Sequence, residues 1–329
     1  MDLKVIIRKN HLLILFLILS NLTYSIQLST VKGLDRLSNY NEIKNINVNR
    51  IYEKNGDKPV FNRENGITYI KGEKVPFDGI MVARRNRGNI TGIYQYSKGK
   101  NEGIGNDYYE NGQLKVKLIS INDKKNGDGY EYYENGKLKC KMQYQDSIDI
   151  YRECFYQNGK LHRIYKQKDG KNGIITGYYE NGIKNSVLSV TQDYSVRGEI
   201  SYISNGQALV YDKKGTLLAD LNYKNDSIIG LQQKFYVNGK LKYDLIAASE
   251  DPKNFKAMDY AIEYYDNSDI IKLDCREKER GKGKWTCKEY NKNGSFKREF
   301  DSPTYKFKQS GTKDWINYLL PVLKLLTGW

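Results

Sequence analysis

The sequence predicts an all-β protein made of tandem β-hairpins, which form an elongated antiparallel meander sheet closed by a short C-terminal helical cap. The first observation is a recurring string, seen as YYENGKLKCKMQY at residues 132–144, in which Asn-Gly lies between aromatic and aliphatic runs. The second is its spacing, because glycines of this string recur every 23 or 24 residues from Gly112 to Gly206. The third is composition, since 29 Tyr against 9 Phe suit strands better than a deep aliphatic core.

Each Asn-Gly pair predicts a two-residue hairpin turn of type I′, because that turn requires positive φ at both central residues. For the turn at Asn135-Gly136, this geometry places Tyr133 opposite Leu138. Period-two alternation then puts Tyr133, Leu138 and Cys140 on one face, while Lys and Glu prevail on the other. A single hairpin is marginal in water, so neighbouring units must stack before the apolar face is covered.

The repeated segments resemble the bacterial MORN-repeat-variant family, which includes YwqK-type antitoxin-like proteins. The resemblance rests on YYENGQLK, YYENGKLK, FYQNGKLH, YYENGIK and FYVNGKLK, and on NGITYIKGEKVPFDG at residues 65–79, which is similar to that family's opening unit. It covers residues 61–300, where we place the hairpin array. It implies a module that binds another macromolecule, in an antitoxin or immunity-like role. The alternative is an envelope structural protein whose basic face binds anionic glycan or lipid.

The two ends of the chain carry different patterns. Residues 1–25 have the layout of a secretory signal peptide, with basic residues, a short apolar run and then small residues; a membrane anchor is the alternative. A signal implies a periplasmic, envelope or extracellular location. Residues 26–60 form a polar lead-in with little pattern. Residues 301–329 place Trp and Leu on one side of a predicted amphipathic helix, which we expect to cover the last hairpin rather than adsorb to a membrane.

Four cysteines follow the predicted signal: Cys140, Cys154, Cys275 and Cys287. The midpoint of each successive pair, Ser147 or Gly281, lies in a segment suited to a turn, so each pair would lie opposite across one hairpin. We therefore expect Cys140–Cys154 and Cys275–Cys287 disulfides in an exported chain. A four-cysteine zinc site is the rival, but neither pair has the close spacing that such sites favour.

Few groups outside the predicted signal suit catalysis. His162 is the one histidine there, and we place it at an exposed strand position rather than in a catalytic role. The sequence contains no nucleophile-elbow or phosphate-loop motif. The loops rich in Asp and Asn depart from the order of a calcium-binding loop and suit turns better. We therefore expect no enzymatic activity, no cofactor and no metal site.

The tyrosine doublets and the net charge bear on the partner. One Tyr of each doublet is needed for the apolar layer, so Tyr108, Tyr132 and Tyr178 would point outward as a candidate aromatic surface; cross-strand packing is the alternative role. The formal net charge of +15 permits attraction to anionic glycan or a membrane surface, or belongs to a merely solvated Lys-rich surface. An export signal argues against nucleic acid, so we expect the partner to be another protein.

Overall fold

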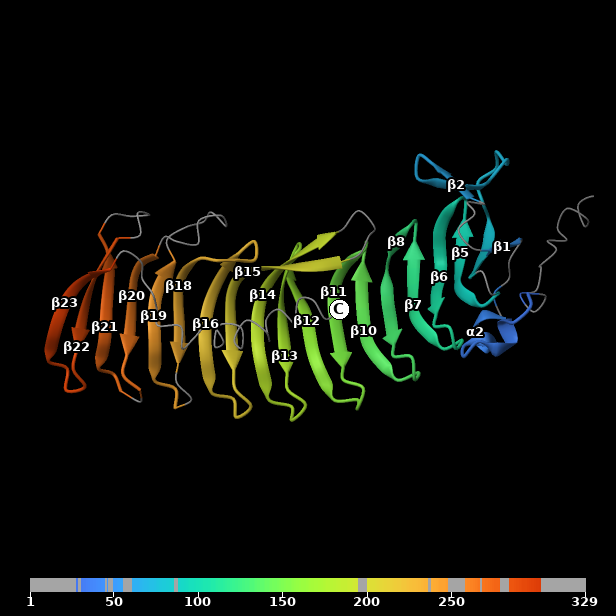
Figure 1. The fold of residues 1–329 in the computed structure, drawn as a ribbon. Coiled ribbons are helices and arrows are strands. Elements are labelled where there is room, and N and C mark those ends of the chain that lie inside the picture. The colour runs from blue at the N-terminus through green and yellow to red at the C-terminus, as the bar shows by residue number, and fades with distance from the viewer. Residues whose placement is uncertain are drawn as a thin grey trace, which may run out of the picture. The chain divides into compact units, whose positions relative to one another are not determined.

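The structure is a computed structural model, which describes residues 28, 31–44, 46, 50–55, 61–85, 88–194, 200–235, 238–247, 258–266, 268–278 and 284–302. The described chain is a succession of β-strands joined into hairpins, so the predicted all-β hairpin-repeat fold is confirmed (Figure 1). The predicted signal peptide and all but the first two residues of the predicted C-terminal cap lie outside the described residues. The chain divides into two compact units: Met1–Leu138 with Tyr144–Ser147, and Lys139–Gln143 with Ile148–Trp329.

The first unit opens with two short helices, η2 (Leu34–Arg36) and α2 (Tyr40–Ile43). The strand β1 (Ile51–Asn55) pairs in parallel with β4 (Gly79–Arg84), which makes the sheet mixed rather than purely antiparallel. The strands β2 (Phe61–Glu64) and β3 (Ile67–Ile70) form a separate two-stranded sheet. The remaining strands continue from β4 as antiparallel neighbours: β5 (Ile90–Ser97), β6 (Lys100–Tyr108), β7 (Leu114–Ile121), β8 (Lys124–Lys125), β9 (Gly127–Tyr132) and β10 (Leu138–Gln145), whose residues divide between the units.

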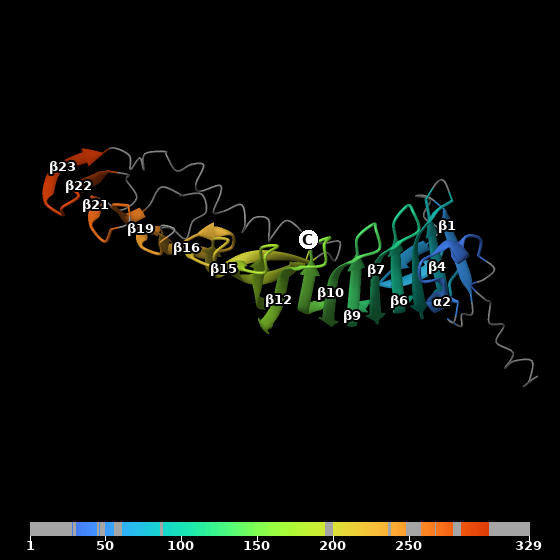
Figure 2. The same cartoon turned by 90° about the horizontal axis from the view of Figure 1, so that it is seen from below.

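The second unit is an antiparallel meander in which successive strands pair with one another, and β16 pairs with both β17 and β18 (Figure 2). Its first strands are β11 (Ile148–Phe155), β12 (Leu161–Asp169), β13 (Asn172–Tyr178), β14 (Lys184–Tyr194), β15 (Ile200–Tyr211) and β16 (Leu217–Lys224). The others are β17 (Ser227–Ile228), β18 (Gly230–Phe235), β19 (Leu241–Ala247), β20 (Met258–Tyr264), β21 (Ile271–Glu277), β22 (Trp285–Tyr290) and β23 (Phe296–Ser302).

The turn at Asn135-Gly136 contains three residues, so the predicted type I′ geometry is wrong there. The amide of Tyr133 donates to the carbonyl of Lys137 at 2.8 Å, and the amide of Gly136 donates back to Tyr133 at 2.8 Å. Only Gly136 of the pair has positive φ, at 78°, while the Asn135 side chain accepts the Lys137 amide at 3.1 Å. This pattern is a three-residue loop that ends in a glycine bulge.

The extra turn residue shifts the strand pairing by one position. The first member of the aromatic doublet, not the second, now faces the aliphatic residue after the turn, as in Tyr108 opposite Leu114 and Phe155 opposite Leu161. A register shift beside each of these pairs then restores the alternation. The predicted grouping of Tyr133 and Leu138 on one face is therefore wrong, because a one-residue slip moves a side chain to the other face.

Type I′ turns do occur, at the opposite edge of the sheet. Both central residues have positive φ at Asn122-Asp123 (52° and 67°) and at Asp146-Ser147 (50° and 70°). Asn and Asp tolerate this region because their short side chains bond locally. The predicted turn around Ser147 is therefore confirmed. The type I′ prediction also holds at Asn65-Gly66, where φ is 51° and 80° and Glu64 pairs with Ile67, whereas Asn135-Gly136 forms the other kind of turn.

Gly206 lies inside β15 and is not a hairpin turn, which corrects the predicted series of turns. Its φ is 111°, and a Cβ added there would lie 3.0 Å from the Cβ of Ser189. The register of β14 and β15 shifts at this point, between Leu188 and Val190. Only glycine relieves both constraints, so the two strands bend here and continue as an arm formed by residues 190–194 and 200–204. Figure 1 shows this yellow arm turned across the neighbouring strands.

Each unit has its own core. In the first unit, the segment expected to be a polar lead-in buries apolar side chains, among them Leu34, Leu37 and Ile43, against Val82 and Ile93 of the sheet. Its apolar residues recur at every third position from Leu28 to Ile46, a periodic signal that could have predicted this packing. In the second unit, the buried residues line one face of the sheet and the arm: Tyr165, Ile175, Leu188, Val190, Tyr202, Ala208, Val210, Ala219, Leu221 and Tyr223.

Candidate binding surface

The cysteine pairs predicted from spacing are the pairs bonded in the structure. Cys140 is bonded to Cys154 and Cys275 to Cys287, with Cα–Cα distances of 4.1 Å in both. Cys275 and Cys287 are direct partners in the register of β21 and β22. All four side chains are buried. The two disulfides hold adjacent strands together and are compatible with an oxidising compartment.

The proposed outward aromatic surface is wrong for Tyr108, which is only 5% exposed. The N-terminal segment covers it, and its hydroxyl donates to the side chain of Asn39 at 2.8 Å. Burial also raises the pKa of Tyr108 above its ordinary value. Tyr132, in the first unit, and Tyr178, in the second, are half-buried. Burial raises the pKa of Tyr132 as well. A run of free aromatic rings is therefore not present at these three positions.

In four doublets the second member is a structural link between successive hairpins. Its hydroxyl donates to the backbone carbonyl of the first aromatic residue in the next hairpin at 2.7–2.8 Å. These pairs are Tyr109 to Tyr132, Tyr156 to Tyr178, Tyr179 to Tyr211 and Tyr265 to Tyr290. Half-buried tyrosine can supply both ring packing and a hydrogen bond, so the abundance of Tyr has a structural reason.

His162 lies in the bulge after a three-residue turn and stacks on Tyr156 with ring centroids 4.4 Å apart. It is half-buried, which departs from the exposed position expected for it. Burial, with a smaller effect of the Arg163 cation, lowers its pKa to about 4. The ring is therefore neutral at neutral pH and serves packing.

Hydrogen bonds between buried polar groups hold the arm against the sheet of the second unit. The carboxylate of Asp149, which is 0% exposed, accepts from Arg152 Nε and from the Tyr202 hydroxyl, both at 2.7 Å. Gln192 of the arm donates to the carbonyl of Asp149 at 2.7 Å and to the hydroxyl of Tyr165 at 2.6 Å. These contacts join β11 and β12 to β14 and β15, so the arm is held by a buried polar network.

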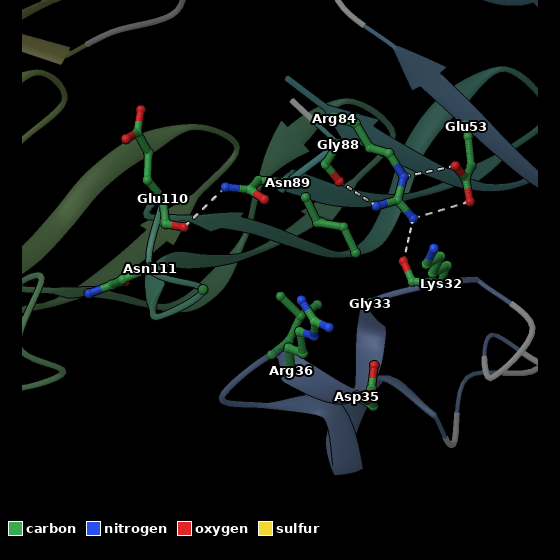
Figure 3. Close-up of a pocket in the computed structure, with 13 residues that line it drawn as sticks. Lys32, Gly33, Asp35, Arg36, Glu53, Arg84, Gly88, Asn89, Glu110 and Asn111 are labelled. Atoms are coloured by element: carbon green, nitrogen blue, oxygen red, sulfur yellow. Dashed lines mark hydrogen bonds and ion pairs between the residues drawn. The ribbon is translucent and has the colours of Figure 1, made fainter. Parts of the chain in front are cut away.

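A depression of about 840 Å³ lies in the first unit between η2 and the turns at Gly88 and Gly112 (Figure 3). The guanidinium of Arg84 donates to Glu53 at 2.8 Å and to the carbonyls of Lys32 and Gly88 at 2.6 and 2.8 Å. Arg84 therefore fastens the N-terminal segment to the sheet through the Lys32 carbonyl, while its ion pair with the partly exposed Glu53 joins β1 to β4. The other charged groups that line the depression are of mixed sign: Lys32, Asp35, Arg36 and Glu110.

The second face of the sheet in the second unit is not buried. Directly opposed residues of β12 to β15 form a partly exposed apolar series, Ile164, Thr176, Val187 and Leu209, with Ile174 beside it at 39% exposed. The same line of opposed residues begins at Glu153 and continues past Leu209 across every later hairpin. The continuation comprises Asp220, Gln233, Asp244, Ile262, Asp274, Lys288 and Glu299.

We call this line the cross-strand row. Its second half carries an acidic residue on every second strand, although the chain as a whole has a net charge of +15. Asp220 accepts from Gln207 at 2.9 and 3.0 Å, and Asp274 pairs with Arg276 at 2.7 Å. Burial raises the pKa of Asp244. The row therefore joins an apolar segment to a carboxylate-bearing segment, an arrangement that the shifted registers hid from sequence reasoning.

Among the described residues, no helix is long and apolar enough to cross a bilayer, and no group of three or more side chains is arranged to hold a metal ion.

Comparison with known proteins finds the MORN repeat variant at residues 101–122 and 125–146. Each match begins near a type I′ turn and contains one three-residue Asn-Gly turn, so the matched unit is one hairpin with its link to the next. A search of curated proteins found no match. A MORN repeat is typical of repeat modules that bind, and residues 101–146 carry this repeat.

Proposed function

We propose that this chain is a non-catalytic repeat protein that binds another protein through the cross-strand row of its second unit. The observation that carries the proposal is the contrast between the two faces of that sheet. One face buries its side chains, whereas the other presents Ile164, Ile174, Val187 and Leu209 partly exposed to solvent. A set of apolar side chains on a rigid sheet, bordered by polar groups, is a common basis of protein recognition.

The most concrete form of this role is toxin neutralisation or immunity, as in the YwqK-type antitoxin-like proteins that the hairpins resemble. Binding a toxin would require a rigid surface, and the disulfides and tyrosine links supply rigidity. The disulfides also agree with a chain that is exported to the periplasm or beyond.

An envelope structural role is the second candidate, because the three-residue turns are rich in exposed lysine. Lys137 in the first unit, and Lys160, Lys213 and Lys214 in the second, lie in or beside these turns and are exposed. Such an edge would attract anionic glycan or lipid, and this attraction would weaken steeply with salt.

A complex of defined stoichiometry would test the proposal. The oxidised chain, immobilised through its N-terminal region, is mixed with an envelope extract of the source cells, and the retained protein is purified and returned to the chain in solution. Sedimentation should give one discrete complex that survives moderate salt. Retention of anionic vesicles or glycan alone, lost as salt is raised, would contradict a protein partner and support the envelope role.

A further inference from the structure

We infer that the cross-strand row of the second unit binds an amphipathic segment of a partner protein that carries basic side chains beside its apolar residues. This inference deepens the proposed function and rests on it. The apolar series requires apolar residues in the partner segment, and the carboxylates that follow it require basic ones.

The chain contains a template for such binding in its first unit. Residues opposed across that sheet form the equivalent line, Val82, Ile93, Asn106 and Lys117. The N-terminal segment covers this line, since its apolar side chains pack in one cluster with Val82 and Ile93. Glu42 of the same segment pairs with Lys117 at 2.6 Å. One short segment therefore covers the apolar residues of that line and pairs with its charged residue.

From β16 onward, the equivalent repeat positions in the second unit carry the opposite charge. Lys117 lies three residues after Leu114, which closes its turn, and Asp220 lies three residues after Leu217, which closes another. The segment that fits the second unit must therefore match carboxylates, not an ammonium group. Lys or Arg would meet that need, and the N-terminal segment of this chain, which carries Glu42, would not.

The dimensions suit one short segment. Neighbouring strands lie about 4.8 Å apart, so the apolar series from Ile164 to Leu209 spans about 14 Å, or roughly ten residues of helix. Asp220 follows on the next strand. A helix of about 18 residues would cover the apolar series and reach the first carboxylates.

Two designed peptides of about 18 residues test the inference with the full oxidised chain. Both carry Leu on one helical face; one carries Lys and the other Glu on the remaining positions. The Lys peptide should bind at least tenfold more tightly in fluorescence anisotropy at physiological salt. Because the net charge of the chain is +15, unspecific attraction would produce the reverse order. Equal affinities, or tighter binding of the Glu peptide, would overturn the inference.

Variants locate the site. Asp220→Lys should reduce the preference for the Lys peptide at least fivefold, and Asp220→Asn should reduce it less. Asp169→Lys makes the same charge change at an exposed turn of β12 and should leave the preference unchanged. Circular dichroism checks that each variant is folded. An unchanged preference in both Asp220 variants would contradict the assignment.

The chain's own C-terminal segment is another occupant that the experiment separates. Substituting Lys313 and Lys324 by Glu in the full chain should leave the affinity for the Lys peptide unchanged. A tenfold gain in affinity would mean that this segment occupies the row, and would overturn the assignment of an external partner. Failure of the proposed function is distinct, because a captured protein that binds the Asp220→Lys chain as tightly as the unchanged chain would refute this inference alone.

Discussion

Replacing Asp149 by alanine should release the arm of the second unit. The carboxylate accepts two hydrogen bonds, from Arg152 and from the Tyr202 hydroxyl, and is 0% exposed. Arg152 is 9% exposed, so the substitution leaves a buried cation without this counterion. Breaking a buried ion pair in this way costs about 3–5 kcal/mol. We expect this loss to lower the free energy of opening the arm, because the contacts of the arm with β11 depend on Asp149.

Hydrogen exchange measures that opening directly. A loss of about 3–5 kcal/mol corresponds to a fall of roughly 10²- to 10⁴-fold in protection of arm amides, provided that they exchange through local opening. Asp149→Asn keeps an acceptor and should cause a smaller fall. Asp266→Ala, at an exposed turn, should change protection by less than about threefold, the usual range for surface substitutions. A fall of less than tenfold in Asp149→Ala would refute the role of this network.

Three further predictions concern the repeat itself. Gly136→Val should destabilise the first unit by about 1–3 kcal/mol in urea unfolding, since its φ is 78°, while Lys137→Val should cost under about 0.5 kcal/mol; equal losses would contradict the bulged turn. Tyr156→Phe should cost about 1 kcal/mol by removing the bond to the Tyr178 carbonyl, and a neutral result in the same assay would count against the tyrosine links. His162 has a folded pKa near 4, below its unfolded value, so the unfolded state binds its proton first as pH falls. Stability should therefore drop between about pH 6.5 and 4, by about 1–2 kcal/mol once partial exposure is discounted, and His162→Gln should lose this part of the pH profile.

Much of the fold follows from local sequence signals. Asn-Gly at a regular spacing predicts hairpins, and two cysteine pairs with turn residues between them predict cross-strand bonds. What local signals do not determine is how many residues each turn holds. Asn-Gly suits a type I′ turn and a three-residue bulged turn alike, because Gly supplies positive φ in both. A single extra residue at Gly136 exchanges the faces of Tyr133 and Tyr132, so every surface prediction built on that register changes with it.

The candidate surface was harder to predict for the same reason. The residues of the cross-strand row can be identified only when the registers of all the hairpins from β11 to β23 are known. In the sequence, Asn205-Gly206 matches the pattern of another hairpin turn. In the structure, Gly206 instead permits a bend within β15 that folds the arm over the sheet. The N-terminal segment is different, because Leu34 and Leu37 belong to a series of apolar residues at every third position from Leu28 to Ile46. This series predicts a buried segment, but only the structure shows the sheet on which it packs.

Footprinting of the purified partner complex tests the central claim most directly. Hydroxyl-radical labelling should mark Ile174 and Leu209 in the free chain and much less in the complex, while Leu188 on the buried face stays unlabelled in both. Ile121 is 54% exposed in the first unit and should be labelled equally with and without the partner. Protection of Ile121 with unchanged labelling of Ile174 and Leu209 would contradict the claim that the chain binds its partner through the cross-strand row.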